Sequence, residues 1–339
     1  MMIQNWIYRA GVRTLFILLF ILVGCKNFPL IDSKRTPTPN DSSSTQRTHS
    51  LPDDDYEDAN PLTPPSDSAK TPSTSIPSPN GTSTSTALSE PKIGVIIGPG
   101  FLRSFLSIGI LQEFYRARIP VYGLVGLEWG SLPAALYSLN GQANEVEWQM
   151  LKMSESSILK KSLIRNQIET QSITELQDFL KMAFNHKSFD QSKIPFECLS
   201  YDYKKKQYFW MKKNEIAAAL PYCLATPPFS KPYLNNIGGM DLKLAVDDLR
   251  QKGSNYIVFI DTLGTKSELL DDTFSTEAQI LWSLQQNQLL KSKGLVDFII
   301  DTSSAPYSLL DFGARRDMIR KGQEIGQQAV KKLAAKLRL

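Results

Sequence analysis

Glu128 occupies the position at which an acyl hydrolase would carry a nucleophilic serine. It lies between Gly126 and Gly130, in a stretch (residues 124–137) whose pattern predicts a buried strand, a sharp turn and a helix. This is the layout of a nucleophile elbow, G-x-S-x-G, in which a strained turn lifts a serine oxygen clear of the sheet. The sequence therefore predicts that the turn is kept and that the serine chemistry is absent.

Other side chains could supply chemistry in place of the missing serine. A carboxylate nucleophile needs a histidine to hydrolyse its ester intermediate, and the only histidine in the folded part, His186, lies in a polar, loop-like stretch. Ser131 and Ser107 fall on predicted helices, and we interpret both as packing or surface residues. Glu128 can instead be a carboxylate stabilised at a helix N-terminus, with Arg103 as its natural partner.

Strand and helix patterns alternate through the folded part of the chain. This alternation predicts an α/β fold of three layers (α/β/α), with a mostly parallel central sheet and helices on both faces. Two of the strands flank a lysine-rich turn (204–206) and are expected to form a hairpin. The predicted strands are 92–98, 121–125, 194–201, 207–211, 256–261 and 296–300, and the clearest helices are 103–119 and 314–338.

Residues 1–24 are expected to be a secretory signal peptide. Arg9 and Arg13 precede an uninterrupted apolar run, 15–23, which is shorter than the roughly 20 residues that span a bilayer. The sequence Leu-Val-Gly-Cys ending at Cys25 resembles the lipobox of bacterial lipoproteins, which implies acylation of that cysteine. An uncleaved anchor is the alternative. The resemblance implies a lipid-anchored protein of the bacterial cell envelope, and the residue after Cys25 favours the outer membrane.

Residues 25–91 are expected to be a tether, because Ser, Thr and Pro dominate and few apolar groups are present to offset the entropy of ordering. An acidic cluster, 53–58, could be a partner site, but we interpret it as part of the linker. Residues 92–339 are long enough for one domain. The net charge of +4 is too small to indicate nucleic-acid binding.

Metal and disulfide chemistry are not expected in residues 92–339. No group of cysteine and histidine has metal-ligand spacing, so we expect no metal and no cofactor. Cys198 falls in a strand-like run and Cys223 in a helix-like run. We interpret them as two buried small apolar residues rather than a disulfide.

Four sequence blocks, in order and spacing, resemble those of the patatin-like phospholipase family over nearly the whole of residues 92–330. The first block resembles the glycine-rich oxyanion loop, and the second resembles the elbow. The third resembles the segment that ends in an Asp-Gly-Gly motif, and the fourth resembles the C-terminal end of the family's domain. They are 98–111, 125–137, 217–239 and 308–322. The resemblance implies a patatin-like fold, in which a serine attacks an acyl carbonyl, an aspartate is its base, and loop N–H groups hold the oxyanion.

The chain departs from that family pattern at each of the three catalytic elements. Glu128 occupies the position of the nucleophilic serine. Ile237, which cannot accept a proton, occupies the position of the aspartate that precedes Gly238 and Gly239. In the oxyanion loop, Pro99 replaces a glycine between Gly98 and Gly100 and has no N–H to donate. Arg103 matches the loop's basic residue.

The departures predict that acyl-hydrolase activity has been lost. The sequence therefore favours a membrane-anchored pseudoenzyme that binds a lipid or another envelope protein. The alternative function is an active lipid acyl hydrolase with atypical catalytic residues, and a purely structural envelope lipoprotein is a third class.

Overall fold

The computed structural model describes residues 90–161, 168–169, 171–264 and 274–338. The predicted signal peptide (1–24), Cys25, the acidic cluster and almost all of the predicted tether lie outside these ranges.

One sheet of seven strands organises the described part of the chain, in the order β11-β10-β1-β2-β6-β7, with β9 paired to β6. Neighbouring strands from β11 to β6 are parallel, whereas β7 and β9 both run antiparallel to β6. The strands are β1 (Ile93–Ile97), β2 (Val121–Leu127), β6 (Phe196–Asp202), β7 (Gln207–Met211), β9 (Asn236–Gly238), β10 (Tyr256–Asp261) and β11 (Phe298–Asp301). The predicted mostly parallel sheet and the β6–β7 hairpin are confirmed.

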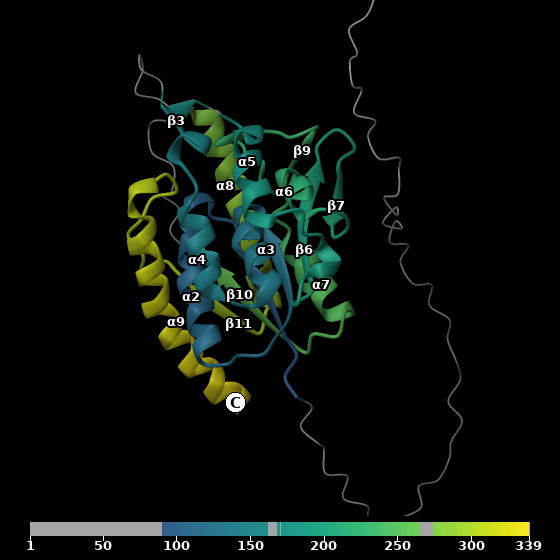
Figure 1. Cartoon of the computed structure of the whole chain (residues 1–339), viewed down its shortest axis with the longest axis vertical. Helices are drawn as coiled ribbons and strands as arrows, with labels where there is room; N and C mark the ends of the chain where they lie inside the picture. Colours follow the sequence, from purple (N-terminus) through teal and green to yellow (C-terminus); the bar gives the residue numbers. More distant parts are fainter. Residues whose placement is uncertain (1–89, 162–167, 170, 265–273, 339) are drawn as a thin grey trace, which may run out of the picture. The chain divides into compact units, whose positions relative to one another are not determined.

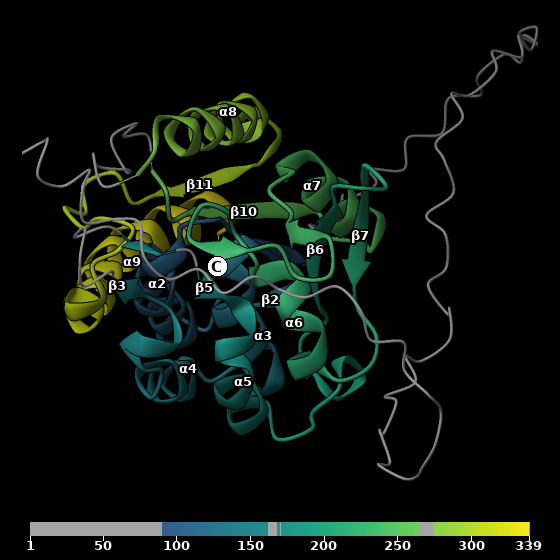
Figure 2. The same cartoon turned by 90° about the horizontal axis from the view of Figure 1, so that it is seen from above.

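Helices cover both faces of this sheet, which confirms the three-layer arrangement. Figure 2 shows α7 and α8 on one side and α3 to α6 on the other, while α9 runs beside α2 (Figure 1). The helices are α2 (Phe105–Arg116), α3 (Ser131–Asn140), α4 (Ala143–Leu151), α5 (Gln177–Phe184), α6 (Ile216–Leu224), α7 (Leu242–Gln251), α8 (Thr276–Ser292) and α9 (Arg315–Leu337). Short strand pairs lie outside the main sheet: β3 (Lys160–Lys161) with β4 (Ile168–Glu169), and β5 (Gln171–Ser172) with β8 (Ser230–Lys231).

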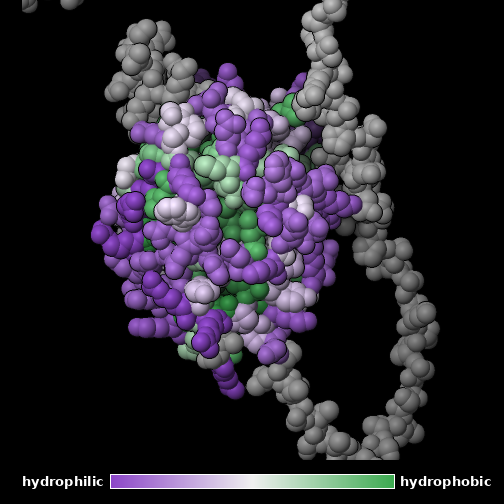
Figure 3. Space-filling view, viewed as in Figure 1, coloured by the Kyte–Doolittle hydropathy of each residue, from purple (hydrophilic) through white to green (hydrophobic). Residues whose placement is uncertain are grey.

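The core lies between the sheet and its helices. β1 is buried along its whole length, as its unbroken apolar sequence requires for a central strand. The face that carries α3, α4 and α6 is largely polar, with a hydrophobic strip down its middle (Figure 3). No helix in the described ranges is long and apolar enough to cross a bilayer.

A disulfide joins Cys198 on β6 to Cys223 on α6, with 6.1 Å between the Cα atoms. The expectation of two unpaired cysteines is therefore wrong. The two residues are 25 positions apart in the chain, and they meet because α6 folds back over the strand that carries Cys198. Both side chains are fully buried, as predicted.

Helices α2 and α9 touch backbone to backbone. A Cβ atom added to Gly109 would lie 2.0 Å from the Ile319 carbonyl oxygen, and one added to Gly322 would lie 2.1 Å from the Leu106 carbonyl oxygen. Because neither backbone can yield locally, each glycine sets the distance between the helices.

We predict that Gly322→Ala destabilises the domain by about 1–3 kcal/mol, since the added methyl group forces two packed helices apart. Chemical denaturation measures the change. Gly313→Ala is the matched control, because an added Cβ there meets nothing within 4 Å. Equal stability of the two variants would contradict the close packing of α2 on α9.

Candidate functional site at the elbow

The turn after β2 has the geometry of a nucleophile elbow. β2 ends at Leu127, Glu128 takes a φ of +50°, and a single 3-10 turn leads into α3. The neighbouring glycines are required by close contacts: an added Cβ at Gly126 would lie 2.2 Å from Ser131 Cα, and one at Gly130 would lie 2.3 Å from Ile97 O. The predicted strand–turn–helix is thus confirmed, and it holds a non-glycine residue in left-handed backbone, a conformation that costs about 1 kcal/mol or more.

The Glu128 carboxylate accepts hydrogen bonds from the glycine-rich loop that follows β1. The Gly100 N–H donates to Glu128 Oε2 at 2.7 Å, and the Phe101 N–H donates to the same oxygen at 3.4 Å. These are backbone donors of the kind that hold a developing oxyanion in acyl transfer. Here they are already occupied by a side chain of the protein itself.

Glu128 is completely buried, and its second carboxylate oxygen, Oε1, has no hydrogen bond within the described part of the chain. Burial raises the pKa of the carboxyl, and the hydrogen bond from the Gly100 N–H lowers it less strongly. The carboxyl therefore holds its proton to a higher pH than an exposed glutamate.

The loop keeps its shape through Thr262, which directly follows β10. The Thr262 hydroxyl lies 3.0 Å from the Gly98 carbonyl oxygen and 2.6 Å from that of Pro99, and the Gly98 N–H donates to Ile260 O at 2.9 Å. Pro99, which has no N–H, contributes its carbonyl instead. The loop is therefore tied to the end of β10, with its next two N–H groups directed at Glu128.

Arg103 does not pair with Glu128, so the expectation of that ion pair is wrong. Its guanidinium donates to the carbonyl oxygens of Thr262, Thr302, Ala305 and Tyr307 at 2.6–3.0 Å. Burial lowers the pKa of Arg103, while the nearby charges of Asp261 and Asp301 raise it. The residue anchors the loop after β11 to the end of β10, because a buried guanidinium needs acceptors for all its N–H groups.

The Asp-Gly-Gly-equivalent segment lies directly against the elbow. A Cβ added to Gly238 on β9 would lie 3.1 Å from Glu128 Cα, and the Gly239 N–H donates to Leu199 O at 2.8 Å. Ile237 is half-buried and pairs with Tyr201 of β6. The fold thus brings together the three segments that the sequence marked, and Ile237 adds no acid or base to them.

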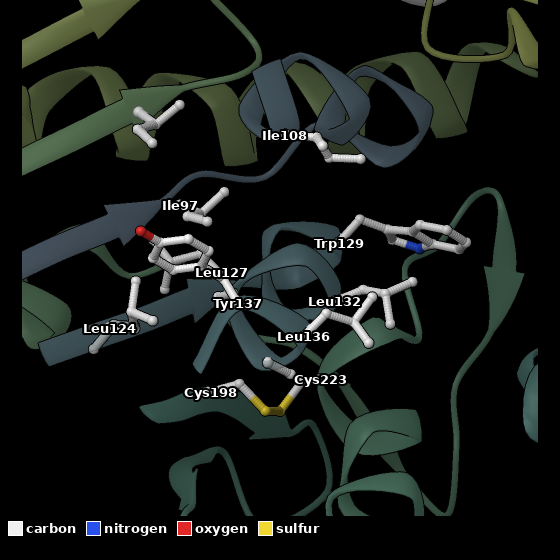
Figure 4. Packing of buried hydrophobic residues seen from close by; sticks show 14 of the residues in the cluster. Ile97, Ile108, Leu124, Leu127, Trp129, Leu132, Leu136, Tyr137, Cys198 and Cys223 are labelled. Atoms are coloured by element: carbon white, nitrogen blue, oxygen red, sulfur yellow. A yellow bond between two sulfur atoms is a disulfide. The ribbon is translucent and has the colours of Figure 1, made fainter. Parts of the chain in front are cut away.

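Aromatic rings fill the space around the loop and the elbow. The Trp129 ring meets Phe101 edge-on at 4.6 Å between centroids, and Phe101 stacks on Phe229 at 4.4 Å. Phe229 in turn contacts Trp282 of α8 at 5.2 Å. None of these four rings is more than 2% exposed. In the close view of Figure 4, Leu132 and Leu136 lie between Trp129 and the disulfide. Phe229 lies in the block 217–239 that the sequence related to the Asp-Gly-Gly segment, whereas no sequence pattern connected Trp282 to this site.

The other candidate residues do not complete a catalytic set. His186 is exposed and lies 3.2 Å from Glu215 Oε1, Ser107 donates to the Ser104 carbonyl, and the buried Ser131 hydroxyl has no partner in the described ranges. No cluster of histidine, cysteine and acidic residues that could hold a metal is found among the described residues.

The comparisons with known proteins are sparse. No protein-family model matches the sequence. Among solved structures, VipD from Legionella pneumophila aligns with a TM-score of 0.40 and 11% identity, over 72% of this chain and 67% of that one. A likeness of this extent identifies no activity.

We predict that Glu128→Gln makes the domain more stable than the wild type at neutral and alkaline pH. A carboxyl whose pKa is raised by folding favours the folded state while protonated, and that contribution is lost as the pH rises through the folded-state pKa. The amide keeps an oxygen for the Gly100 N–H and cannot ionise. Urea unfolding over a pH series measures the difference between the two proteins, which should shrink towards acidic pH.

The exposed Glu145→Gln serves as the control for this series and should leave the pH profile unchanged. A constant difference between Glu128→Gln and the wild type at every pH would show that ionisation of Glu128 does not affect stability.

Proposed function

We propose that this chain is a patatin-like domain without acyl-hydrolase activity, carried on a lipid-anchored protein of the bacterial cell envelope, where it binds a lipid or another envelope protein. The observation that carries the loss of activity is the Glu128 carboxylate on the Gly100 and Phe101 N–H groups. An acyl oxyanion would need the same donors, so a substrate has to compete with a side chain that is already in place.

Two further features support a site without acyl-hydrolase activity. A base is missing at Ile237, and the exposed His186 hydrogen-bonds Glu215 rather than any elbow residue, so a carboxylate nucleophile would lack the histidine that hydrolyses its ester. The fully buried Glu128 and the four packed rings also leave an acyl chain no room beside the carboxylate unless they move.

Exposed apolar side chains on α8 support a binding role. Ile280, Leu281 and Leu284 are 45–63% exposed, whereas Trp282 on the same helix is buried in the aromatic cluster. Apolar residues gathered on an exposed helix are typical of a surface that contacts lipid or a partner protein. Acylation of Cys25 would keep this helix within reach of a membrane.

We expect the purified full-length chain to hydrolyse neither p-nitrophenyl esters nor phospholipid vesicles above background. Paired catalytic groups act as a unit, so Glu128→Ser alone should stay inactive, and Glu128→Ser with Ile237→Asp should recover only traces. Wild-type turnover that disappears in Glu128→Gln would revive the carboxylate nucleophile and the alternative of an active hydrolase. Turnover lost instead in Ser131→Ala or Ser107→Ala would locate the nucleophile elsewhere.

Binding to lipid can be tested apart from the anchor. In a Cys25→Ser chain that lacks residues 1–24, and with them the apolar run 15–23, we expect Ile280→Ser with Leu284→Ser to weaken sedimentation with phospholipid vesicles about tenfold or more, since each buried apolar side chain contributes about 1.5–3 kcal/mol. Met182→Ser on α5 is the control, because Met182 is 55% exposed and Ile280 is 56% exposed. Equal loss in control and test variants, or no vesicle binding at all, would leave an envelope protein as the partner.

A further inference from the structure

Two turns lie side by side at the end of the sheet that carries the elbow. One is the tip of the β6–β7 hairpin, residues 203–206, and the other, 233–236, leads into β9. The Tyr203 N–H donates to the Asn235 carbonyl oxygen at 3.1 Å, and the Tyr203 hydroxyl lies 3.4 Å from Asn235 Oδ1. Strands β2 and β6 are parallel, so both turns lie beyond the carboxyl ends of these strands, where the elbow also lies (Figure 1).

Leu234 is exposed at the tip of the second turn, in a backbone conformation that does not suit leucine. The backbones of Tyr233 and Asn236 exchange hydrogen bonds of 2.9 and 2.8 Å, so Leu234 and Asn235 are the two central residues of a tight turn. Both have positive φ, 45° and 65°, a geometry that favours asparagine and glycine. The Leu234 side chain is 57% exposed, so packing inside the domain does not offset this strain. A strained and exposed leucine indicates an apolar partner outside the domain.

The first turn is positively charged. Lys204, Lys205 and Lys206 are exposed, and none of them forms an ion pair with a described residue. The buried Asp202 accepts the N–H groups of Lys204 and Lys205 at 2.9 and 3.0 Å, which fixes the shape of the turn. Among the described residues, Asp241 also acts on this hairpin from a position near β7, where it caps α7. Three ammonium groups against these two carboxylates leave the turn positive.

We propose that these two turns dock the domain on an anionic phospholipid bilayer. Leu234 and the ring of Tyr203, which is 44% exposed, enter the interfacial layer, and the lysines at 204–206 lie among the lipid phosphates. Tyrosine is enriched at that depth, and each lysine near an anionic surface raises the affinity about fivefold. A bilayer offers apolar depth and negative charge together and needs no shaped pocket, which suits two convex tips.

This docking deepens the proposed function and rests on its lipid-binding alternative. It would turn the carboxyl end of the sheet towards the membrane. Helix α8 contributes to the same end, because its Trp282 contacts Phe229 in the aromatic cluster beside the elbow. The membrane would therefore face the end of the domain that carries the elbow.

Sedimentation with two kinds of vesicle tests the docking, on the Cys25→Ser chain that lacks residues 1–24. One kind is phosphatidylcholine alone, and the other contains equal parts of phosphatidylcholine and phosphatidylglycerol. We expect at least about tenfold tighter binding to the mixed vesicles, because three lysines contribute about fivefold each at an anionic surface. Salt at about 1 M should remove this difference, since it screens charges beyond about 3 Å.

Lys204→Gln with Lys206→Gln should weaken binding to the mixed vesicles at least about tenfold and leave binding to phosphatidylcholine unchanged. Lys331→Gln with Lys332→Gln is the matched control, because it removes the same charge from two exposed lysines of α9. The C-terminal end of α9 lies at the opposite end of the sheet, beside the start of β11 (Figure 1). This control should bind like the unsubstituted chain.

Leu234→Asn tests the apolar contact apart from the charge. Asparagine tolerates positive φ, so the variant should fold at least as stably, and thermal unfolding checks this. Binding to both kinds of vesicle should weaken about tenfold or more, because a leucine side chain no longer enters the interfacial layer.

Equal affinity for the two kinds of vesicle, equal loss in the two lysine pairs, or full binding by Leu234→Asn would overturn the docking alone. If only Ile280→Ser with Leu284→Ser loses binding, lipid binding belongs to α8 and the turns are excluded. No vesicle binding at all would overturn the docking together with the lipid-binding function. The absence of acyl-hydrolase activity is measured separately with the ester substrates and does not depend on these results.

Discussion

The carboxylate of Glu128, held by the N–H groups of Gly100 and Phe101, joins the two segments on which this site depends. Those donors come from the loop after β1, and the acceptor comes from the turn after β2. Parallel neighbouring strands end at the same edge of a sheet, so the two turns necessarily meet there. What differs from an acyl-transfer site is the occupant, since a permanent internal acceptor takes the place of a transient oxyanion.

Maintaining this contact requires other buried polar groups to be satisfied nearby. Thr262 holds the carbonyl side of the loop, and Arg103 uses its guanidinium to hold the chain that follows β11. Lys293 pairs with the buried Asp261 at the end of β10. Each of these groups would be costly to bury alone. The carboxyl end of the sheet therefore carries a connected network of polar groups enclosed by aromatic rings. This arrangement makes the site rigid and hinders the entry of a ligand.

The two ends of the sheet differ in how they use buried polar groups. At the elbow, one Glu128 oxygen is paired within the protein and the space around it is filled by rings. At the other end, Glu197 and Ser254 are among the residues that line an open cavity. Room for a ligand is therefore found away from the residues that mark the family resemblance.

The sequence by itself determined the alternating strands and helices, the elbow turn and the absence of a serine at its tip, because these depend on local patterns and on the glycines that close contacts demand. Only the tertiary structure decided what each polar side chain meets. Arg103 was expected beside Glu128 and lies among carbonyl oxygens instead, and Cys198 bonds Cys223 across two layers of the fold. Such pairings join residues far apart in the chain, so no spacing in the sequence encodes them.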